Sequence, residues 1–154
     1  MNKIKLTNSD KYFLIDSCDI RKISKYKWHL RDGKYVCAGP KFKGPIISLA
    51  RYLLNTPKGM IADHKNGDTL DNRRVNLRNC SPSESAQNRG GWSKKNGKYK
   101  GVYLDRKRKK YRAVIVANGV SYSLSRHDTQ EDAAREYDTW AKKLHGEFAR
   151  LNFK

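Results

Sequence analysis

Hydrophobic and polar residues follow their most regular pattern in the last third of the chain. Three runs there combine β-branched or aromatic residues with alternating polar positions, which predicts strands at residues 100–104, 111–116 and 120–125. Asn118-Gly119, between the last two runs, is typical of a type I′ hairpin turn. Apolar residues then recur at helical spacing up to Gly146, behind a cap at Asp128 or Thr129. This pattern predicts an α+β unit in which a three-stranded antiparallel sheet packs on one helix.

The first third carries weaker signals of mixed α and β structure. Short apolar runs flanked by turn residues predict a strand at 12–15, a short helix within 16–26, a hairpin joining 28–30 to 35–37, and a helix within 46–54. Pro57 and Gly59 end that last helix. The region therefore predicts a small mixed unit without a long helix or an internal repeat.

Residues 60–88 form a polar segment that is rich in Asp and Asn. Ile61-Ala62 is apolar, and a polar stretch with an Asn-Gly turn follows it. Apolar residues return at Val75 and Leu77. Ser81-Pro82-Ser83-Glu84 is a capping box with proline at the first helical position, so we expect a helix to begin there. The order strand, polar loop, strand, helix predicts a ββα unit.

The composition of residues 89–98 marks a boundary between two domains. The segment reads Arg-Gly-Gly-Trp-Ser-Lys-Lys-Asn-Gly-Lys, and such a mixture of glycine, serine and lysine is typical of a linker. We therefore expect one domain at residues 1–88, a basic linker at 89–98 and a second domain at 99–154. Both domains are small for independent stability, which a bound partner would increase.

The charge balance indicates a polyanionic partner. The chain has 34 Lys and Arg against 15 Asp and Glu, a formal charge of +19, which fits DNA but also fits an RNA-binding or ribosomal protein. No apolar stretch approaches a membrane-spanning length of about 18 residues, and the N-terminus has no apolar signal-peptide core. Three cysteines without CxxC spacing argue against a disulfide framework and a cysteine-rich zinc site, and each is expected to be buried. These features favour a cytoplasmic protein that does not bind membranes.

Asp63 and His64 are the residues with the clearest chemistry in the polar segment. A carboxylate is a hard oxygen ligand for Mg²⁺ or Mn²⁺, and an imidazole can take a proton from water. Together they meet the minimum for metal-assisted hydrolysis of a phosphodiester. Neighbours on a regular strand face opposite sides, so both reach one phosphate only if the strand frays at this point.

The wider pattern resembles the signature of HNH homing endonucleases of phages and mobile introns. The resemblance covers about thirty residues in order and in spacing: Asp63-His64-Lys65-Asn66-Gly67-Asp68, Leu70-Asp71-Asn72-Arg73 and Asn76-Leu77-Arg78. It implies a ββα-metal core at about residues 60–88. It also implies that Asp63 is a metal ligand, that His64 is the general base, and that Asn76 fixes the loop behind the histidine.

The sequence departs from the family pattern at the position of the second metal ligand. The family has an Asn or His on the helix about nine residues after the middle asparagine, and Ser85 occupies that position here. Asn88 lies three residues further along, on the same side of a helix. Ser85 or Asn88 is therefore the predicted second ligand, and a hydroxyl is the weaker of the two.

The last third resembles the ethylene-response-factor (Apetala-type) DNA-binding domain of plants. The matching motifs are Tyr99-Lys100-Gly101-Val102, Tyr111-Arg112-Ala113, Ala133–Asp138 and the closing Leu151-Asn152-Phe153. The resemblance implies a sheet that lies in the major groove of double-stranded DNA. Tyr111, Tyr103 and Ser125 replace residues that are usual in the family, so the base preference does not transfer. The candidate DNA contacts are Lys100, Tyr103, Arg106, Lys107, Arg108, Arg112 and Arg126.

The sequence thus predicts a metal-dependent DNA endonuclease of the homing type, which either nicks its target or cuts both strands. We expect it to act as a monomer without an obligate protein partner. Two other interpretations stay open. One is a non-catalytic, sequence-specific DNA-binding protein with a degenerate HNH site, and the other is an RNA-binding protein in which the Asp63–Asn76 pattern is accidental.

Overall fold

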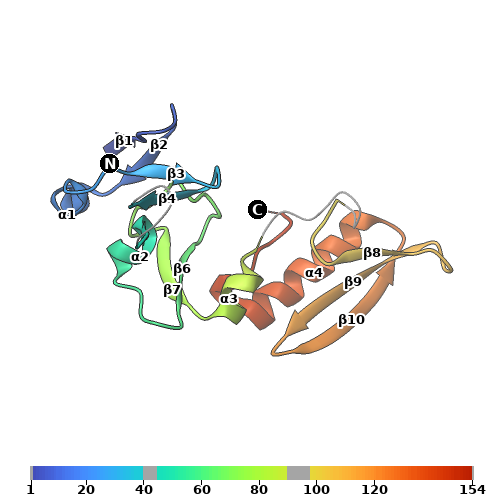
Figure 1. The fold of residues 1–154 in the computed structure, drawn as a ribbon. Coiled ribbons are helices and arrows are strands. Elements are labelled where there is room, and N and C mark those ends of the chain that lie inside the picture. Colours follow the sequence, from blue (N-terminus) through green and yellow to red (C-terminus); the bar gives the residue numbers. More distant parts are fainter. Residues whose placement is uncertain (1, 40–44, 90–97, 154) are drawn as a thin grey trace. The chain divides into compact units, whose positions relative to one another are not determined.

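The computed structural model describes residues 2–39, 45–89 and 98–153 (Figure 1). The chain divides into two compact units, Met1–Pro82 and Ser83–Lys154, and each is described separately. This division falls after the first residue of the helix that the sequence assigns to the first domain. Most of the predicted linker at 89–98 lies outside the described residues, so that linker and the three-part domain division remain predictions.

The described residues of the first unit form three small antiparallel sheets, two short α-helices and one 3-10 turn. Its elements are β1 (Asn2–Lys5), β2 (Tyr12–Ile15), η1 (Ser17–Asp19), α1 (Ile20–Ile23), β3 (His29–Arg31), β4 (Tyr35–Ala38), β5 (Ile47–Ser48), α2 (Leu49–Leu54), β6 (Ile61–His64) and β7 (Leu77–Cys80). The sheets are β1-β2, β3-β4-β5 and β6-β7. The predicted strand at 12–15 and the hairpin after residue 28 are confirmed. The helix expected within 46–54 begins only at Leu49, because Ile47 and Ser48 pair with β4.

One hydrophobic core joins these sheets. Phe13 and Ile15 of β2, Leu49 and Leu53 of α2, and Leu77 of β7 are all buried in it. The indole of Trp28 is buried as well, and its Nε1 donates to the carbonyl of Ile23 at 3.0 Å. Because Leu77 belongs to this core, the β6–β7 hairpin is held by the strands that precede it in the chain.

The second unit contains the sheet and the helix predicted for the last third. Its elements are α3 (Pro82–Gln87), β8 (Val102–Asp105), β9 (Lys110–Ala117), β10 (Val120–His127), α4 (Gln130–His145) and η3 (Gly146–Phe148). The strand order is β10-β9-β8, with both pairs antiparallel. Asn118 and Gly119 both have positive φ, as a type I′ turn requires. Thr129 caps α4 by accepting from the amide of Asp132, and Gly146 ends the helix.

The two faces of this sheet have different surroundings. Alternate residues of β9, Ala113 and Ile115, are buried in the core that α4 forms with its Ala133, Tyr137 and neighbouring residues. The residues that alternate with them, Arg112, Val114 and Val116, point to the other face. Helix α4 thus covers one face, and Figure 1 shows it running along the three strands.

The closing Leu-Asn-Phe motif has a structural role in this unit. The Asn152 side chain accepts from the amide of Lys100 at 2.6 Å and donates to its carbonyl at 3.1 Å. The carboxylate of Asp138 in α4 is buried and accepts from the backbone amides of Asn152 and Phe153. These bonds attach the end of the chain to the start of β8 and to α4.

Two expectations from composition have definite outcomes. No helix in the described ranges is long and apolar enough to cross a membrane. All three cysteines are free thiols, and Cys37 and Cys80 are buried as predicted. The prediction is wrong for Cys18, which is exposed, because η1 lies at the surface of the first unit and only Asp19 in it is buried.

Gly101 supplies a test of this packing. Its φ is +72°, and an added Cβ would lie 2.2 Å from the Tyr137 ring and 2.7 Å from the carbonyl oxygen of Val114. Gly119 has a similar φ of +78°, with nothing within 4 Å of an added Cβ. Gly101→Ala is therefore expected to lower the free energy of unfolding of the full chain by about 3 kcal/mol or more, and Gly119→Ala by about 1 kcal/mol. Urea unfolding measures both, and equal losses would contradict the packing described here.

Candidate functional site

The β6–β7 hairpin carries the predicted catalytic pair. Pairing is regular to the end of β6, with Asp63 opposite Arg78 and His64 opposite Leu77. The strand does not fray at Asp63 and His64, because both residues keep their cross-strand partners. Their side chains leave the strand on opposite faces. The turn begins only after His64, where the amide of Gly67 donates to the His64 carbonyl.

Asp63 is held by a buried arginine. The Nε and Nη2 atoms of Arg78 lie 3.0 and 2.9 Å from Asp63 Oδ2. Both side chains are about nine-tenths buried. Removing one partner of such a pair leaves a buried charge, at a cost of about 3–5 kcal/mol. The guanidinium therefore fixes the position of the carboxylate. Arg78 is part of the sequence motif, but the spacing of the motif does not predict that Arg78 pairs with Asp63.

His64 is almost completely buried, with 8 % of its surface exposed. Its Nε2 lies 3.2 Å from Oδ1 of Asn72. Burial lowers the pKa of His64, while the hydrogen bond with Asn72 and the nearby carboxylates of Asp63 and Asp68 act in the opposite direction. The imidazole is consequently held mostly neutral at neutral pH, as a residue that accepts a proton must be. Sequence analysis missed Asn72 as its partner.

Asn76 holds the loop that follows His64. Its Oδ1 accepts from the amide of Asn66 at 3.0 Å, and its Nδ2 donates to the carbonyl of Asp71 at 2.7 Å. Its own carbonyl accepts from the amide of Lys65. One buried side chain thus connects the start of the loop to its middle, and the predicted role of Asn76 in fixing the loop stays a prediction.

The far side of this loop is attached to β2 and η1. Leu14 donates its amide to the carbonyl of Leu70 and accepts from the amide of Asn72, at 2.8 and 3.0 Å. Arg74 forms a bidentate pair with Asp19, at 2.7 and 2.6 Å. The N-terminal strands therefore support the site, although they contribute none of its predicted catalytic residues.

The predicted second ligand belongs to the second unit. Ser85 lies in α3 and is partly buried, while Asn88 follows the helix, is buried, and donates its amide to the carbonyl of Glu84. The packing of this helix on the hairpin, which a ββα-metal fold implies, remains a prediction, as does the choice between Ser85 and Asn88.

The donor chemistry of the first unit fits one kind of metal site. Within the described residues, no three His, Cys, Asp or Glu side chains are grouped to hold a metal ion. A single carboxylate, Asp63, fits Mg²⁺ or Mn²⁺ bound partly by water and a substrate phosphate. It does not fit a closed zinc site with four protein ligands.

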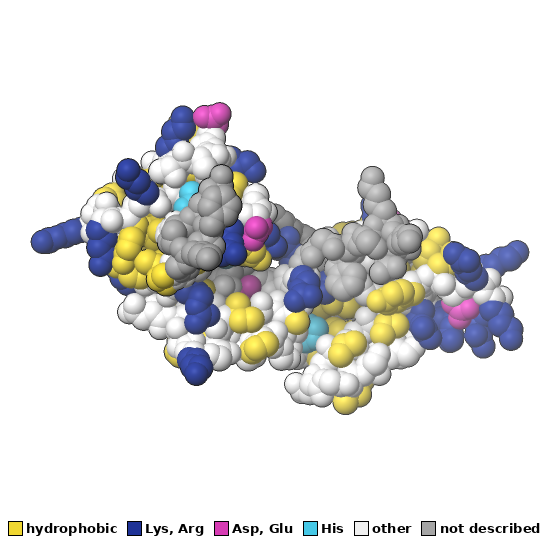
Figure 2. Space-filling model, in the orientation of Figure 1, with side chains coloured by type: hydrophobic (Ala, Val, Ile, Leu, Met, Phe, Trp, Pro, Cys, Tyr) yellow, Lys and Arg dark blue, Asp and Glu magenta, His cyan; other side chains and the backbone are white. Residues whose placement is uncertain are grey.

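Three predicted DNA contacts form one row across the sheet of the second unit. Tyr103 is opposite Arg112, and Arg112 is opposite Arg126, on the face that α4 leaves open. Arg106, Lys107 and Arg108 are exposed in the turn after β8. Asp105 orients two of these arginines, since its Oδ2 lies 3.0 Å from Arg126 Nε and 3.5 Å from Arg108 Nη1. Figure 2 shows Lys and Arg side chains gathered around this end of the sheet.

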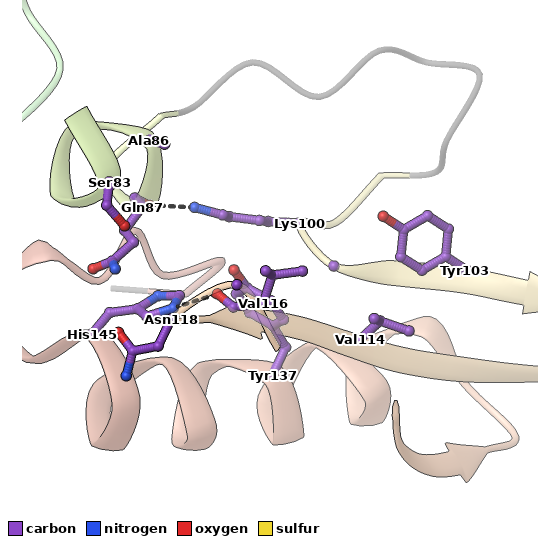
Figure 3. Close-up of a pocket in the computed structure, with 12 residues that line it drawn as sticks. Ser83, Ala86, Gln87, Lys100, Tyr103, Val114, Val116, Asn118, Tyr137 and His145 are labelled. Carbon is purple, nitrogen blue, oxygen red and sulfur yellow. Dashed lines mark hydrogen bonds between the residues drawn. The ribbon is translucent and has the colours of Figure 1, made fainter. Parts of the chain in front are cut away.

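Lys100 does not belong to this surface. It is 7 % exposed, and its Nζ donates to the carbonyls of Gln87 and Arg89 at 2.5 and 3.3 Å (Figure 3). Burial, followed by the charge of Arg150, lowers the pKa of Lys100 to about 8. The prediction that Lys100 contacts DNA is therefore corrected, because its ammonium group is used at the C-terminal end of α3. A cavity of about 240 Å³ lies beside it, lined in part by Tyr137 and His145.

Comparison with known proteins gives two family matches, one in each half of the chain. The model of a family described as HNH endonuclease matches residues 55–87, and that of the AP2 domain matches residues 97–147. An uncharacterised HNH endonuclease of Acanthamoeba polyphaga mimivirus is 30 % identical over 136 residues, which cover 84 % of this chain and 68 % of the relative. Protein 3.8 of Escherichia phage T7 is 32 % identical over 95 residues, or 62 % of this chain and 78 % of the relative. No solved structure gives a significant match.

Asn76 and Asn79 make a matched pair for testing the loop. Asn76→Ala leaves the amide of Asn66 and the carbonyl of Asp71 without their partner, so we expect a loss of about 2–4 kcal/mol in the free energy of unfolding. Asn79→Ala should change it by less than about 1 kcal/mol, because Asn79 Oδ1 has no hydrogen-bond partner. Urea unfolding of the full chain measures both variants. Similar losses would show that Asn76 does not hold the loop.

Proposed function

Because the chain belongs to the HNH endonuclease family and contains an AP2 domain, we propose that it is a metal-dependent DNA endonuclease of the homing type. It would hydrolyse phosphodiester bonds of double-stranded DNA and act as a monomer. One observation carries the proposal. The Asp63–His64 pair ends β6 at a loop that Asn76 closes, inside the segment that the HNH family model matches.

In this proposal His64 is the general base. Its buried neutral imidazole takes a proton from the attacking water, and the loop fixed by Asn76 keeps the ring in place. Asp63 would hold the Mg²⁺ or Mn²⁺ ion, together with Ser85 or Asn88. Such an ion supplies Lewis-acid stabilisation of the charge on the phosphate and on the leaving oxygen. Asp63 and His64 point to opposite faces of the strand, so a phosphate within reach of both has to lie across the end of β6.

The second unit would supply affinity and register. Tyr103, Arg112 and Arg126 lie in one row on the open face of the sheet, where they reach the phosphates or base edges of a groove. Arg106, Lys107 and Arg108 extend this basic surface along the β8–β9 turn. Electrostatic attraction should then dominate affinity, in agreement with the formal charge of +19.

The alternative function is a DNA-binding protein that does not cut. Two observations favour it. Ser85 is at the position where the family has a stronger metal ligand, and the Asp63 carboxylate already forms an ion pair with Arg78. Both would weaken a metal site without affecting the sheet of the second unit. Cleavage distinguishes the two functions directly, because each predicts binding.

Cleavage of supercoiled plasmid tests the endonuclease. With Mg²⁺ or Mn²⁺ the native chain is expected to nick or linearise the plasmid, and EDTA should stop the reaction. His64→Ala should reduce the rate by about 100-fold or more, since a general base contributes about 10²–10⁴-fold. His29→Ala is the matched control, because His29 lies in β3 of the same unit without a predicted role. A native chain that shifts the plasmid but never cuts it would establish the alternative function.

Binding of duplex DNA tests the sheet. Arg112→Ala is expected to raise the Kd by roughly 3- to 10-fold at low salt, because it removes one contact on the open face. Lys142→Ala removes the same charge from the exposed surface of α4 and should change the Kd by about twofold or less. Fluorescence anisotropy with a labelled duplex measures both. Equal effects would mean that total charge, and not the open face, determines binding.

A further inference from the structure

We propose that Asn72 is a positioning residue for His64, which fixes both the tautomer and the orientation of the imidazole. In this arrangement Nε2 carries the proton and Nδ1 is the basic nitrogen. The inference rests on the proposed function, in which His64 is the general base, and adds a residue that neither the sequence nor the comparisons assign to the site.

The Asn72 amide can face His64 in only one way. Its Nδ2 donates to the carbonyl oxygen of Thr69 at 3.1 Å. A carbonyl only accepts hydrogen bonds, so the NH₂ group has to point toward Thr69, and Oδ1 consequently points toward His64. Oδ1 lies 3.2 Å from Nε2 of the ring. Because an amide oxygen cannot donate, Nε2 has to be the protonated nitrogen of the neutral imidazole.

The burial of Asn72 makes this orientation difficult to change. Asn72 is only 1 % exposed and is among the most deeply buried side chains of the protein. Turning its amide over would place the oxygen against the Thr69 carbonyl, where two acceptors face each other without water. Because the amide strongly prefers one orientation, it also fixes the tautomer and the orientation of the His64 ring.

The backbone beside Asn72 is fixed as well. The amide of Asn72 donates to the carbonyl of Leu14 at 3.0 Å, and Leu14 and Asp71 form a parallel bridge. Leu14 belongs to β2, whose neighbouring residues Phe13 and Ile15 are completely buried. The position of the imidazole therefore depends on the core of the first unit through one asparagine.

Asn72 and Asn76 have different contacts in this loop. The Asn76 side chain bonds to backbone groups of the loop, whereas the Asn72 side chain contacts the imidazole itself. Loss of Asn76 should change the loop, and loss of Asn72 should change the ring. An outer partner that orients a functional histidine in this way typically contributes 10- to 100-fold.

The tautomer of the native chain is the first measurement. Two-bond ¹H–¹⁵N correlation spectra of the full chain, recorded at about pH 9, well above the ordinary pKa of imidazole, identify the protonated nitrogen of His64. The signal is assigned by its absence from His64→Ala. A neutral ring protonated at Nε2 is expected. A ring protonated at Nδ1 would overturn the inference, and this result needs no variant of Asn72 to fold.

Two variants then separate the contact with the ring from the contact with the loop. Asn72→Leu and Asn72→Asp both lose the donor to Thr69, but only Asp keeps an acceptor for Nε2. At about pH 9 we expect Asn72→Leu to lower kcat for plasmid cleavage by about 10- to 100-fold with little change in KM, and to allow the second tautomer. Asn72→Asp should keep the native tautomer and a kcat within about fivefold of native.

The results distinguish this inference from the proposed function. If the native chain does not cut DNA, His64 is not a general base and the proposed function is wrong, even if the spectrum shows a ring protonated at Nε2. A native chain that cuts, together with a folded Asn72→Leu that keeps both the tautomer and kcat, overturns the role of Asn72 alone. Equal losses of kcat in Asn72→Leu and Asn72→Asp would also overturn it, because the loss would then come from the missing hydrogen bond to Thr69 and not from the contact with the ring.

Discussion

The loop between β6 and β7 keeps its shape because buried polar side chains satisfy part of its backbone groups, together with backbone bonds to Leu14 of β2. Asn76 bonds to an amide and a carbonyl of the loop, and Asn72 bonds to the Thr69 carbonyl and to His64. A buried amide or carbonyl without a partner is costly, so these few side chains determine where the loop runs. The proposed general base is positioned by the same bonds, which makes its geometry a consequence of how the loop folds.

Acidic residues are few in this basic chain, and several of them are used in internal ion pairs of the first unit. Asp63 pairs with Arg78, Asp71 with Arg73 and Asp19 with Arg74. The pairing with Arg73 lowers the pKa of Asp71, so this carboxylate stays ionised. In the second unit Asp105 holds Arg108 and Arg126 at the end of the open sheet face. The carboxylates thus organise arginines, while the unpaired positive charge that remains favours a polyanionic partner.

The second unit shows how a family motif combines structural and functional residues. Gly101 allows the Tyr137 ring to pack against the start of β8, and Asn152 connects the end of the chain to the same place. Neither residue reaches the open face. Lys100 belongs to the same motif but is buried against the carbonyls of Gln87 and Arg89. Affinity for DNA is therefore expected from the middle of the sheet and from the β8–β9 turn.

The sequence by itself determined the elements whose signals are local. The type I′ turn at Asn118-Gly119, the alternation in β9, the capped helix α4 and the order β6–β7–α3 all follow from spacing along the chain. Through resemblance to a family it also predicted roles for Asp63, His64 and Asn76. Only the tertiary structure decided that Arg78 binds Asp63, that Asn72 contacts His64 and that Lys100 is buried. The physical reason is that burial and side-chain hydrogen bonds depend on which residues the fold brings together, and a local pattern does not contain that information.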